Sequence, residues 1–261
     1  MTAPKKSLGQ HFLSDPKILG RIADALDPAP DEAVLEIGPG PGGLTAALLT
    51  RTSRLTLIEK DREFLKPLRS RFPQVIIAAG DALELDWHAL TGQGPFSVIG
   101  NIPYNITSPL IDRALLPPRP RRVVFLVQKE VGDRLAAAPG TSEYGALTVG
   151  VQSVARVERL FSIPAGAFRP PPKVDSAVVR LTPLAEPLIR DDEVAPFRRF
   201  VVGLFALRRK QLGRALRSLL GVDAERAKAL AAAASLAETI RMETVAPAGF
   251  VALFRAGRQG G

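Results

Sequence analysis

Short apolar runs alternate with segments of helical spacing along the first half of the chain. The runs typical of buried strands are 33–37, 55–59, 74–79, 96–100 and 123–128. Between them lie segments that place apolar residues at helical intervals, namely 43–50, 61–72, 108–116 and 129–138. Strands that alternate with helices indicate a parallel sheet covered on both faces and joined by right-handed crossovers. The pattern predicts a Rossmann-like α/β fold.

The pattern changes in the second half. Two further apolar segments, 146–155 and 176–182, flank a proline-rich stretch, so we expect an antiparallel pair to end the sheet. Beyond residue 190 the strand pattern stops, and the segments 194–220 and 224–240 have helical spacing. A chain of 261 residues has room for one to two domains. We therefore predict a catalytic α/β domain over residues 1–185 and a small all-helical domain over 186–261.

Composition narrows the possible classes of protein. A hydrophobic content of 46% with 23% charged residues is that of a globular protein and excludes wholesale disorder. The absence of cysteine excludes disulfides, thiolate zinc sites and a cysteine nucleophile, and the two histidines, His11 and His88, lie far apart in sequence. We expect no metal. Without a long apolar run or an apolar N-terminal signal, we also expect a cytoplasmic protein that binds no membrane.

The charge of the chain favours a polyanionic partner. Lysine and arginine number 35 against 26 acidic residues, a net charge of +9. The segment 194–222 contains no acidic residue, and its basic residues are Arg198, Arg199, Arg208, Arg209, Lys210, Arg214 and Arg217. A solvated helix face usually mixes both signs of charge. This segment therefore favours a surface that contacts nucleic-acid phosphates.

A glycine-rich loop follows the first predicted strand. Gly38, Gly40 and Gly43 satisfy G-x-G-x-x-G between a strand and a helical segment, where glycines let the backbone approach a ligand. Glu59, at the end of the second strand, can accept hydrogen bonds from both hydroxyls of a ribose. The two features predict a nucleotide-like cofactor. Alone, these two features fit a nicotinamide-dependent dehydrogenase equally well. A glycine turn that serves only the packing of helix against strand is the non-functional alternative.

Polar side chains also follow the third and fourth strands. Asp81 comes after strand 74–79, where ligands of open α/β sheets bind and where it can accept from an amine such as adenine N6. The sequence Asn-Ile-Pro-Tyr, residues 101–104, follows strand 96–100, and Asn101 and Asn105 are the only asparagines in the chain. An ordinary turn after a strand is the alternative interpretation of this tetrapeptide.

Asn-Ile-Pro-Tyr has a specific chemical use at an adenine amine, whose lone pair is delocalised into the ring. If the side-chain oxygen of Asn101 and a backbone carbonyl of Ile102 or Pro103 accept its two N–H bonds, the lone pair can point at an electrophile. Tyr104 offers an aromatic face on which a base taken out of its stack can lie. The loop therefore favours adenine N6 as the group that reacts.

Six motifs in this order resemble a known family. They are KKSLGQHFL (5–13), EIGPGPGGLT (36–45), LIEKD (57–61), GDAL (80–83), NIPYNITSP (101–109) and FRPPPKVDS (168–176). The chain resembles the S-adenosylmethionine-dependent rRNA adenine N6,N6-dimethyltransferases, and above all the bacterial group that dimethylates two adjacent adenosines near the 3′ end of 16S rRNA. The resemblance extends to RRKQLGRAL (208–216) in the helical region. It implies S-adenosyl-L-methionine as cofactor and 16S rRNA in small ribosomal subunit particles as partner.

The resemblance implies roles for individual positions. Gln10, His11 and Leu13 would close over the methionine end of the cofactor. The other cofactor-binding positions are Gly38, Gly40, Glu59, Asp81 and Asn101. The catalytic positions are Asn101, Ile102, Pro103, Tyr104 and Phe168, with Phe168 against the target base opposite Tyr104. The RNA-binding positions are Arg208, Arg209, Lys210 and Arg214.

Three alternatives stay open at this point. Methyltransferases of the antibiotic-resistance type act on 23S rRNA adenine, and some relatives are non-catalytic RNA-binding or ribosome-assembly factors. A dehydrogenase is the third, although neither histidine follows a strand in a loop suited to a catalytic acid. Because the sequence contains no long heptad repeat or apolar stripe, we expect a monomer.

Overall fold

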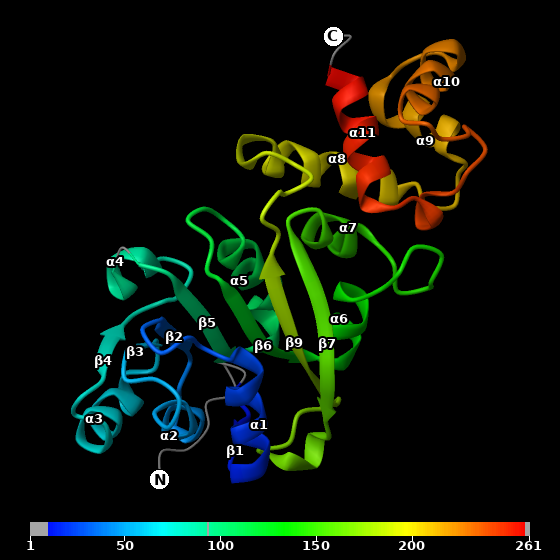
Figure 1. The fold of residues 1–261 in the computed structure, drawn as a ribbon. Helices are drawn as coiled ribbons and strands as arrows, with labels where there is room; N and C mark the ends of the chain where they lie inside the picture. The colour runs from blue at the N-terminus through cyan, green and yellow to red at the C-terminus, as the bar shows by residue number, and fades with distance from the viewer. Residues whose placement is uncertain (1–9, 93, 259–261) are drawn as a thin grey trace. The chain divides into compact units, whose positions relative to one another are not determined.

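The computed structural model describes residues 10–92 and 94–258. Its chain divides into two compact units (Figure 1). The first unit contains the chain up to Gly132 and the segment Glu158–Pro183, and the second contains Asp133–Val157 and the chain from Leu184 onwards. The domain boundary predicted after residue 185 lies two residues beyond the last point at which the chain passes from the first unit to the second, between Pro183 and Leu184. The excursion over Asp133–Val157 has no counterpart in the sequence prediction.

The first unit is built on a seven-stranded sheet in the order β4-β3-β2-β5-β6-β9-β7. Its strands are β2 (Ala33–Ile37), β3 (Leu55–Glu59), β4 (Ile76–Ala79), β5 (Phe96–Asn101), β6 (Arg122–Gln128), β7 (Ala155–Ile163) and β9 (Ser176–Pro183). The pairs from β4 to β6 are parallel, and β9 runs antiparallel to β6. Chain order reverses between β2 and β5, so their carboxyl ends flank the position where open α/β sheets bind ligands. The predicted α/β class is confirmed.

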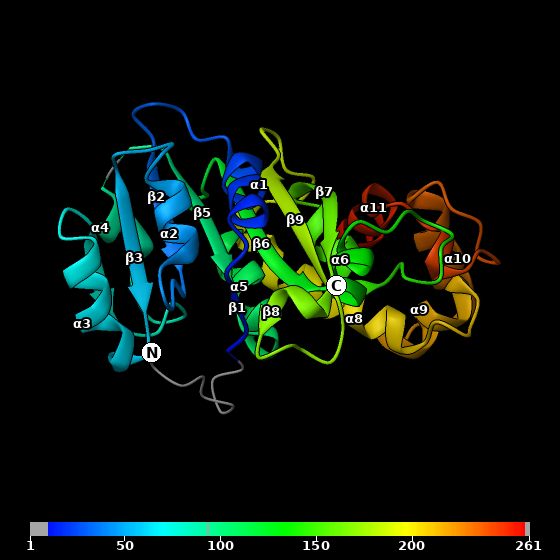
Figure 2. The ribbon, with the colours of Figure 1, turned by 90° about the horizontal axis from the view of Figure 1, so that it is seen from below.

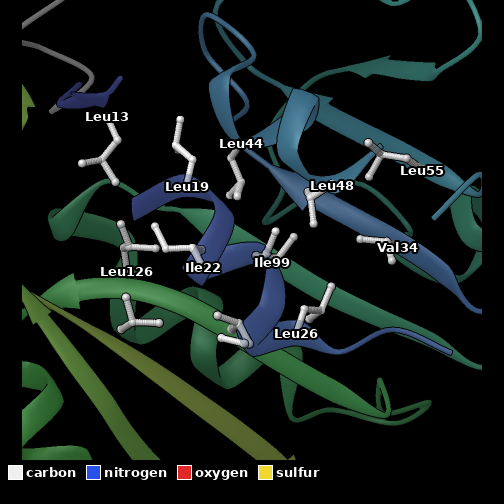
Figure 3. Close-up of a cluster of buried hydrophobic side chains, with 14 of the residues drawn as sticks. Leu13, Leu19, Ile22, Leu26, Val34, Leu44, Leu48, Leu55, Ile99 and Leu126 are labelled. Carbon is white, nitrogen blue, oxygen red and sulfur yellow. The ribbon is translucent and has the colours of Figure 1, made fainter. Parts of the chain in front are cut away.

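Helices join the strands and cover the sheet, whose strands β2 and β3 are buried at every position. The helices are α1 (Pro16–Leu26), α2 (Gly43–Leu48), α3 (Arg62–Arg71), α4 (Trp87–Thr91), α5 (Thr107–Ala114) and α6 (Lys129–Leu135). Figure 2 shows α1 and α2 beside each other against the sheet. Leu19, Ile22 and Leu26 of α1 pack with leucines of α2 and alternate residues of the strands, such as Val124 and Leu126 (Figure 3). Burial of this apolar surface is the main contribution to the stability of the unit.

Capping side chains fix where two of these helices begin. Asp15 precedes α1 and accepts a 2.8 Å hydrogen bond from Lys17 N. Asp61 precedes α3 and accepts from Glu63 N at 3.1 Å. Each carboxylate satisfies a backbone N–H that has no partner within its own helix. Asp61 comes two residues after the end of β3, so its cap also fixes the chain direction at the carboxyl edge of the sheet.

A second, two-stranded sheet pairs segments far apart in sequence. Strand β1 (Phe12–Leu13) lies antiparallel to β8 (Phe168–Arg169), with Phe12 opposite Arg169 and Leu13 opposite Phe168. The GQHFL and FRPPPKVDS motifs are therefore held together. The part of the first motif before Gln10 lies outside the described residues.

The prediction of a strand over 146–155 is wrong. Residues Ala146–Gln152 form helix α7, and β7 begins only at Ala155. The apolar residues alternate here, but the helix is too short and too buried to show an amphipathic stripe. Thr148 Oγ1 stabilises the helical start by accepting from Gly145 N at 3.1 Å and donating to Arg134 O at 2.6 Å.

The second unit is helical, as the sequence predicts. Besides α7 it contains α8 (Val194–Ala206), α9 (Leu212–Leu220), α10 (Ala224–Ala233) and α11 (Pro247–Arg258). The segment 194–220 is not one helix, because the chain turns between α8 and α9, where Lys210 N donates to Leu207 O at 2.8 Å. Within the part of the chain that the structure describes, no helix combines the length and apolarity needed to cross a membrane.

Candidate active site

A pocket of about 200 Å³ opens at the carboxyl ends of β2, β3 and β5. It brings together ten of the predicted site residues, namely Gln10, His11, Gly38, Gly40, Glu59, Asp81, Asn101, Ile102, Pro103 and Tyr104. A cofactor and a base that react together need such a shared space. The pocket lies wholly within the first unit.

The glycine loop forms one wall of the pocket. Gly38 and Gly40 have φ angles of +68° and +52°, in the left-handed region that side chains with a Cβ rarely adopt. A Cβ on Gly40 would lie 2.7 Å from Cε1 of Phe12. Glycine at these positions therefore lets the backbone turn beneath the pocket while Phe12 packs against it.

Glu59 is a buried carboxylate at the end of β3. Only 5% of it is exposed, and its oxygens accept from Gly40 N at 3.0 Å and Asp61 N at 2.7 Å. Burial raises the pKa of Glu59, whereas these backbone N–H groups act in the opposite direction. A carboxylate has about four acceptor sites, so the side chain can still accept from a ribose hydroxyl.

Asp81 is paired with a residue that the sequence analysis does not name. Lys60 Nζ lies 2.7 Å from Asp81 Oδ2, and Leu83 N donates to Asp81 Oδ1 at 2.9 Å. The hydrogen bond from Lys60 is the main reason that the pKa of Asp81 lies below its usual value. Lys60 lies within the LIEKD motif and lines the pocket, so its position beside Glu59 is the signal that could have identified it.

The amide of Asn101 has a fixed orientation. Its Nδ2 donates a 2.7 Å hydrogen bond to the backbone carbonyl of His11, which leaves Oδ1 as an acceptor for a ligand. The carbonyl of Pro103 accepts from Ile106 N at 3.1 Å in the turn Tyr104–Ile106. Because Pro103 O is engaged in this turn, Ile102 O is the better second acceptor for an amine.

Tyr104 is held from two sides. Its hydroxyl lies 2.6 Å from Oγ of Ser176, a fully buried residue of β9. Burial raises the pKa of Tyr104, so its phenol is neutral at physiological pH. The ring of His11 stacks on the tyrosine ring with 5.9 Å between centroids and an interplanar angle of 27°.

Leu13 and Phe168 are not brought to this pocket. Leu13 is 9% exposed and Phe168 is fully buried, and both belong to the hydrophobic core cluster. Strand β8, which carries Phe168, pairs with β1, and the ring lies in the core, so its place against a target base stays a prediction. Leu13 lines a separate small cavity next to Asn101 and Glu36.

Two acidic residues near the site escape the sequence analysis. Asp61 accepts from Gln10 Nε2 at 3.0 Å and so ties the segment before β1 to the start of α3. Glu36 is 1% exposed within β2 and accepts from Thr45 Oγ1 at 2.7 Å. Burial raises the pKa of Glu36 to about 8. A carboxyl inside a buried strand is itself a signal, because burial of an unpaired charge is costly.

The predicted RNA-binding residues are all in the second unit. Arg208, Arg209 and Lys210 lie in the turn before α9, and Arg214 and Arg217 lie on α9 itself. All five side chains are exposed. Lys210, Arg214 and Arg217 line one shallow hollow together with Ser218 and Val222. One-signed charge around a hollow is suited to phosphate groups.

This fold and site define a class I, S-adenosylmethionine-dependent methyltransferase. The features that define this class are the parallel sheet, the glycine loop after its first strand, and acidic side chains at the ends of successive strands that line one pocket. The chain belongs to the ribosomal RNA adenine dimethylase family, whose model matches residues 1–256. The predicted rRNA adenine methyltransferase and its cofactor are thereby confirmed, and the dehydrogenase alternative is excluded.

Relatives and solved structures agree with this family. The chain is 42% identical to a ribosomal RNA small subunit methyltransferase A from Geobacter metallireducens, over 97% of this chain and 94% of that protein. It is 46% identical to the protein of that name from Xanthomonas campestris, over 81% and 82%. Among structures, a dimethyladenosine transferase from Plasmodium falciparum has a TM-score of 0.78 at 26% identity, covering 93% and 96%. The 23S rRNA methyltransferase ErmE has a TM-score of 0.73 at 30% identity, covering 95% and 100%.

Proposed function

We propose that this chain transfers methyl groups from S-adenosylmethionine to the N6 amines of two adjacent adenosines near the 3′ end of 16S rRNA. The observation that carries the proposal is the shared pocket, in which the glycine loop and Glu59 lie beside Asn101 and Tyr104. We infer that the substrate is small-subunit rRNA within ribosomal particles, and that a single copy of the chain acts on it in the cytoplasm.

The residues on the cofactor side fit S-adenosylmethionine. Gly38 and Gly40, with positive φ angles, line the pocket with backbone alone, and the carboxylate of Glu59 stands at its edge. We assign the ribose hydroxyls to Glu59 and the adenine N6 of the cofactor to Asp81. When bound, the cofactor supplies an electrophilic methyl group on a sulfonium.

The residues on the substrate side fit an adenine amine. With Nδ2 of Asn101 engaged by His11 O, its Oδ1 can accept one N–H of the target, and Ile102 O can accept the other. Two oriented acceptors direct the nitrogen lone pair out of the ring system and towards the methyl group. The ring of Tyr104, fixed through Ser176, supplies the stacking face. No general base is required, because the methylated ammonium is acidic and releases its proton readily.

The second unit would hold the RNA. The exposed basic side chains at 208–217 can neutralise phosphates without reading sequence, which positions a large substrate while the pocket selects the base. Small-subunit rRNA is favoured over 23S rRNA because relatives of 42% and 46% identity carry the small-subunit name, whereas ErmE is 30% identical.

Methyl transfer to small ribosomal subunit particles tests the proposal. The protein is incubated with labelled S-adenosylmethionine and with small-subunit particles from a strain that lacks the 3′-end adenosine modification, and modified bases are then mapped. We expect label on N6 of the two adjacent adenosines. Particles from a strain that already carries the modification are the control. In a parallel incubation with 23S rRNA, label on that RNA alone would support the antibiotic-resistance type, and binding without label would support an assembly factor.

A further inference from the structure

The imidazole of His11 stacks on Tyr104, the ring that the proposed reaction needs as a stacking surface. Its ring is nearly parallel to that of Tyr104, with centroids 5.9 Å apart. A stacked aromatic partner lies about 4.5–7 Å from the ring it covers, so His11 already stands at the distance that a bound base would take. The two rings both line the pocket that contains Asn101.

His11 also contacts the loop that would hold the target amine, through its backbone. Its own backbone carbonyl accepts the 2.7 Å hydrogen bond from Asn101 Nδ2. An amine held by Oδ1 of Asn101 therefore belongs to a base that shares this small space with the histidine. An adenine and the imidazole cannot occupy the same face of one phenol ring at the same time.

A hydrogen bond outside the pocket anchors the imidazole. His11 Nδ1 lies 2.8 Å from the carbonyl oxygen of Pro170, and because a carbonyl only accepts, Nδ1 carries the hydrogen. Pro170 directly follows β8, whose pairing with β1 holds the backbone on both sides. The side chain can thus leave Tyr104 by losing one hydrogen bond and one stacking contact while the backbone stays paired.

We propose that His11 is a positioning residue for substrate entry, whose imidazole fills the adenine seat on Tyr104 until the target base of the RNA displaces it. This inference rests on the proposed function. In the RNA-free protein, His11 keeps the tyrosine ring stacked and occupies the place that the base would take. Binding of the base then requires the His11 Nδ1–Pro170 O bond to break or lengthen.

Nuclear magnetic resonance of the imidazoles tests the displacement directly. The chain has only two histidines, so the ring signals are few, and His88 serves as an internal control because it contacts Phe96 instead. The tyrosine ring current should shift the His11 signals, and Tyr104→Leu gives their unstacked position. The probe is an RNA hairpin with two adjacent unpaired adenosines, added together with S-adenosylhomocysteine. The hairpin is used at a concentration at which it inhibits the methylation of small-subunit particles in a separate assay.

We expect the adenosine hairpin to move the His11 signals towards their position in Tyr104→Leu, while those of His88 stay in place. A matched hairpin with uridines in place of the adenosines should not move them. If the adenosine hairpin inhibits methylation and the His11 signals do not move, the inference is overturned.

Kinetics with small-subunit particles give a second, independent measurement. His11→Gln removes the ring but can still donate to Pro170 O. Loss of the competing stack should lower the KM for RNA by about two- to tenfold at saturating cofactor. His11→Phe restores a ring and should raise the KM again, which a purely structural role would not predict. An unchanged or higher KM in His11→Gln, with cofactor affinity preserved, would show that His11 is a fixed wall of the site and would overturn the inference.

The two proposals fail differently. Absence of methyl transfer to any adenosine by the unaltered protein would remove the proposed function itself. Methyl transfer at the expected adenosines with unmoved His11 signals would leave that function standing and remove only the displacement of His11.

Discussion

Asn101 Nδ2 donates a 2.7 Å hydrogen bond to the backbone carbonyl of His11, a residue 90 positions earlier in the chain. The bond fixes which end of the amide faces a ligand. It also joins the loop that would hold the target amine to the segment that precedes β1. The chemistry assigned to Asn101 therefore depends on a tertiary contact as well as on the motif.

Replacement of Asn101 by alanine should remove most methyl transfer. The loss of one oriented acceptor in a transition state typically costs about 2–4 kcal/mol, or roughly 30- to 1000-fold in rate. Cofactor affinity should change only modestly, because Glu59 and the glycine loop remain. Initial rates and calorimetric titration of the cofactor separate the two effects. A variant with near-normal turnover would contradict the role of Asn101.

Glu59→Gln should act mainly on cofactor binding. A hydrogen bond to a charged group is worth about 1.5–3 kcal/mol, so removal of the charge should weaken cofactor binding by roughly 10- to 150-fold. Turnover should recover at saturating cofactor. Glu84→Gln, an exposed carboxylate outside the pocket lining, is the matched control. Turnover that stays low at saturation would place Glu59 in the chemical step instead.

The basic turn before α9 makes a prediction about salt dependence. Replacement of Arg208, Arg209 and Lys210 together by glutamine should weaken RNA binding and flatten the log–log salt slope by about 2. Affinity for small-subunit RNA at several salt concentrations measures this slope, and cofactor affinity should not change.

A matched triple variant serves as the control for this experiment. Arg226, Lys228 and Arg241 are also exposed in the second unit but lie outside the one-signed segment. Their replacement by glutamine should leave the slope as it is. If both triple variants changed it equally, the contribution would come from net charge and not from the turn.

Glu36 predicts how stability varies with pH. Its pKa is raised from 4.5 to about 8 in the folded protein, so between these values the folded protein holds a proton that the unfolded chain releases. The free energy of unfolding should therefore fall as pH rises through this window. Glu36→Gln stays neutral and can still accept from Thr45, so its melting temperature should vary less with pH. Thermal melts of both proteins across the window check this, and parallel curves would refute it.

The central strands could be predicted closely from sequence. The predicted ranges 33–37 and 55–59 are the observed β2 and β3 because strands buried on both faces are continuous apolar runs with clear ends. The strand prediction failed at 146–155, where the apolar residues of a short buried helix alternate as those of a strand do. Local periodicity cannot distinguish the two when an element is this short.

The candidate site could be predicted as a set of motifs but not as a set of contacts. Motifs at strand ends converge because parallel strands share one carboxyl edge. The bond between His11 and Pro170 spans 159 residues, and the burial of Phe168 depends on the pairing of β8 with β1. Such contacts are set by tertiary packing, which leaves no periodic signal in the sequence.

The second unit is assembled from two separate stretches of chain, so it cannot be expressed or exchanged as one continuous segment. Tyr144, in the early stretch, donates to the carbonyl of Val245 at 2.7 Å, and Leu184 N donates to Val154 O at 2.9 Å. A fragment that starts at residue 184 would lack α7 and the buried Tyr144. Recombination that exchanges RNA-binding regions between relatives would therefore have to carry residues 133–157 along with the C-terminal helices, because a single crossover would join halves that had never packed together.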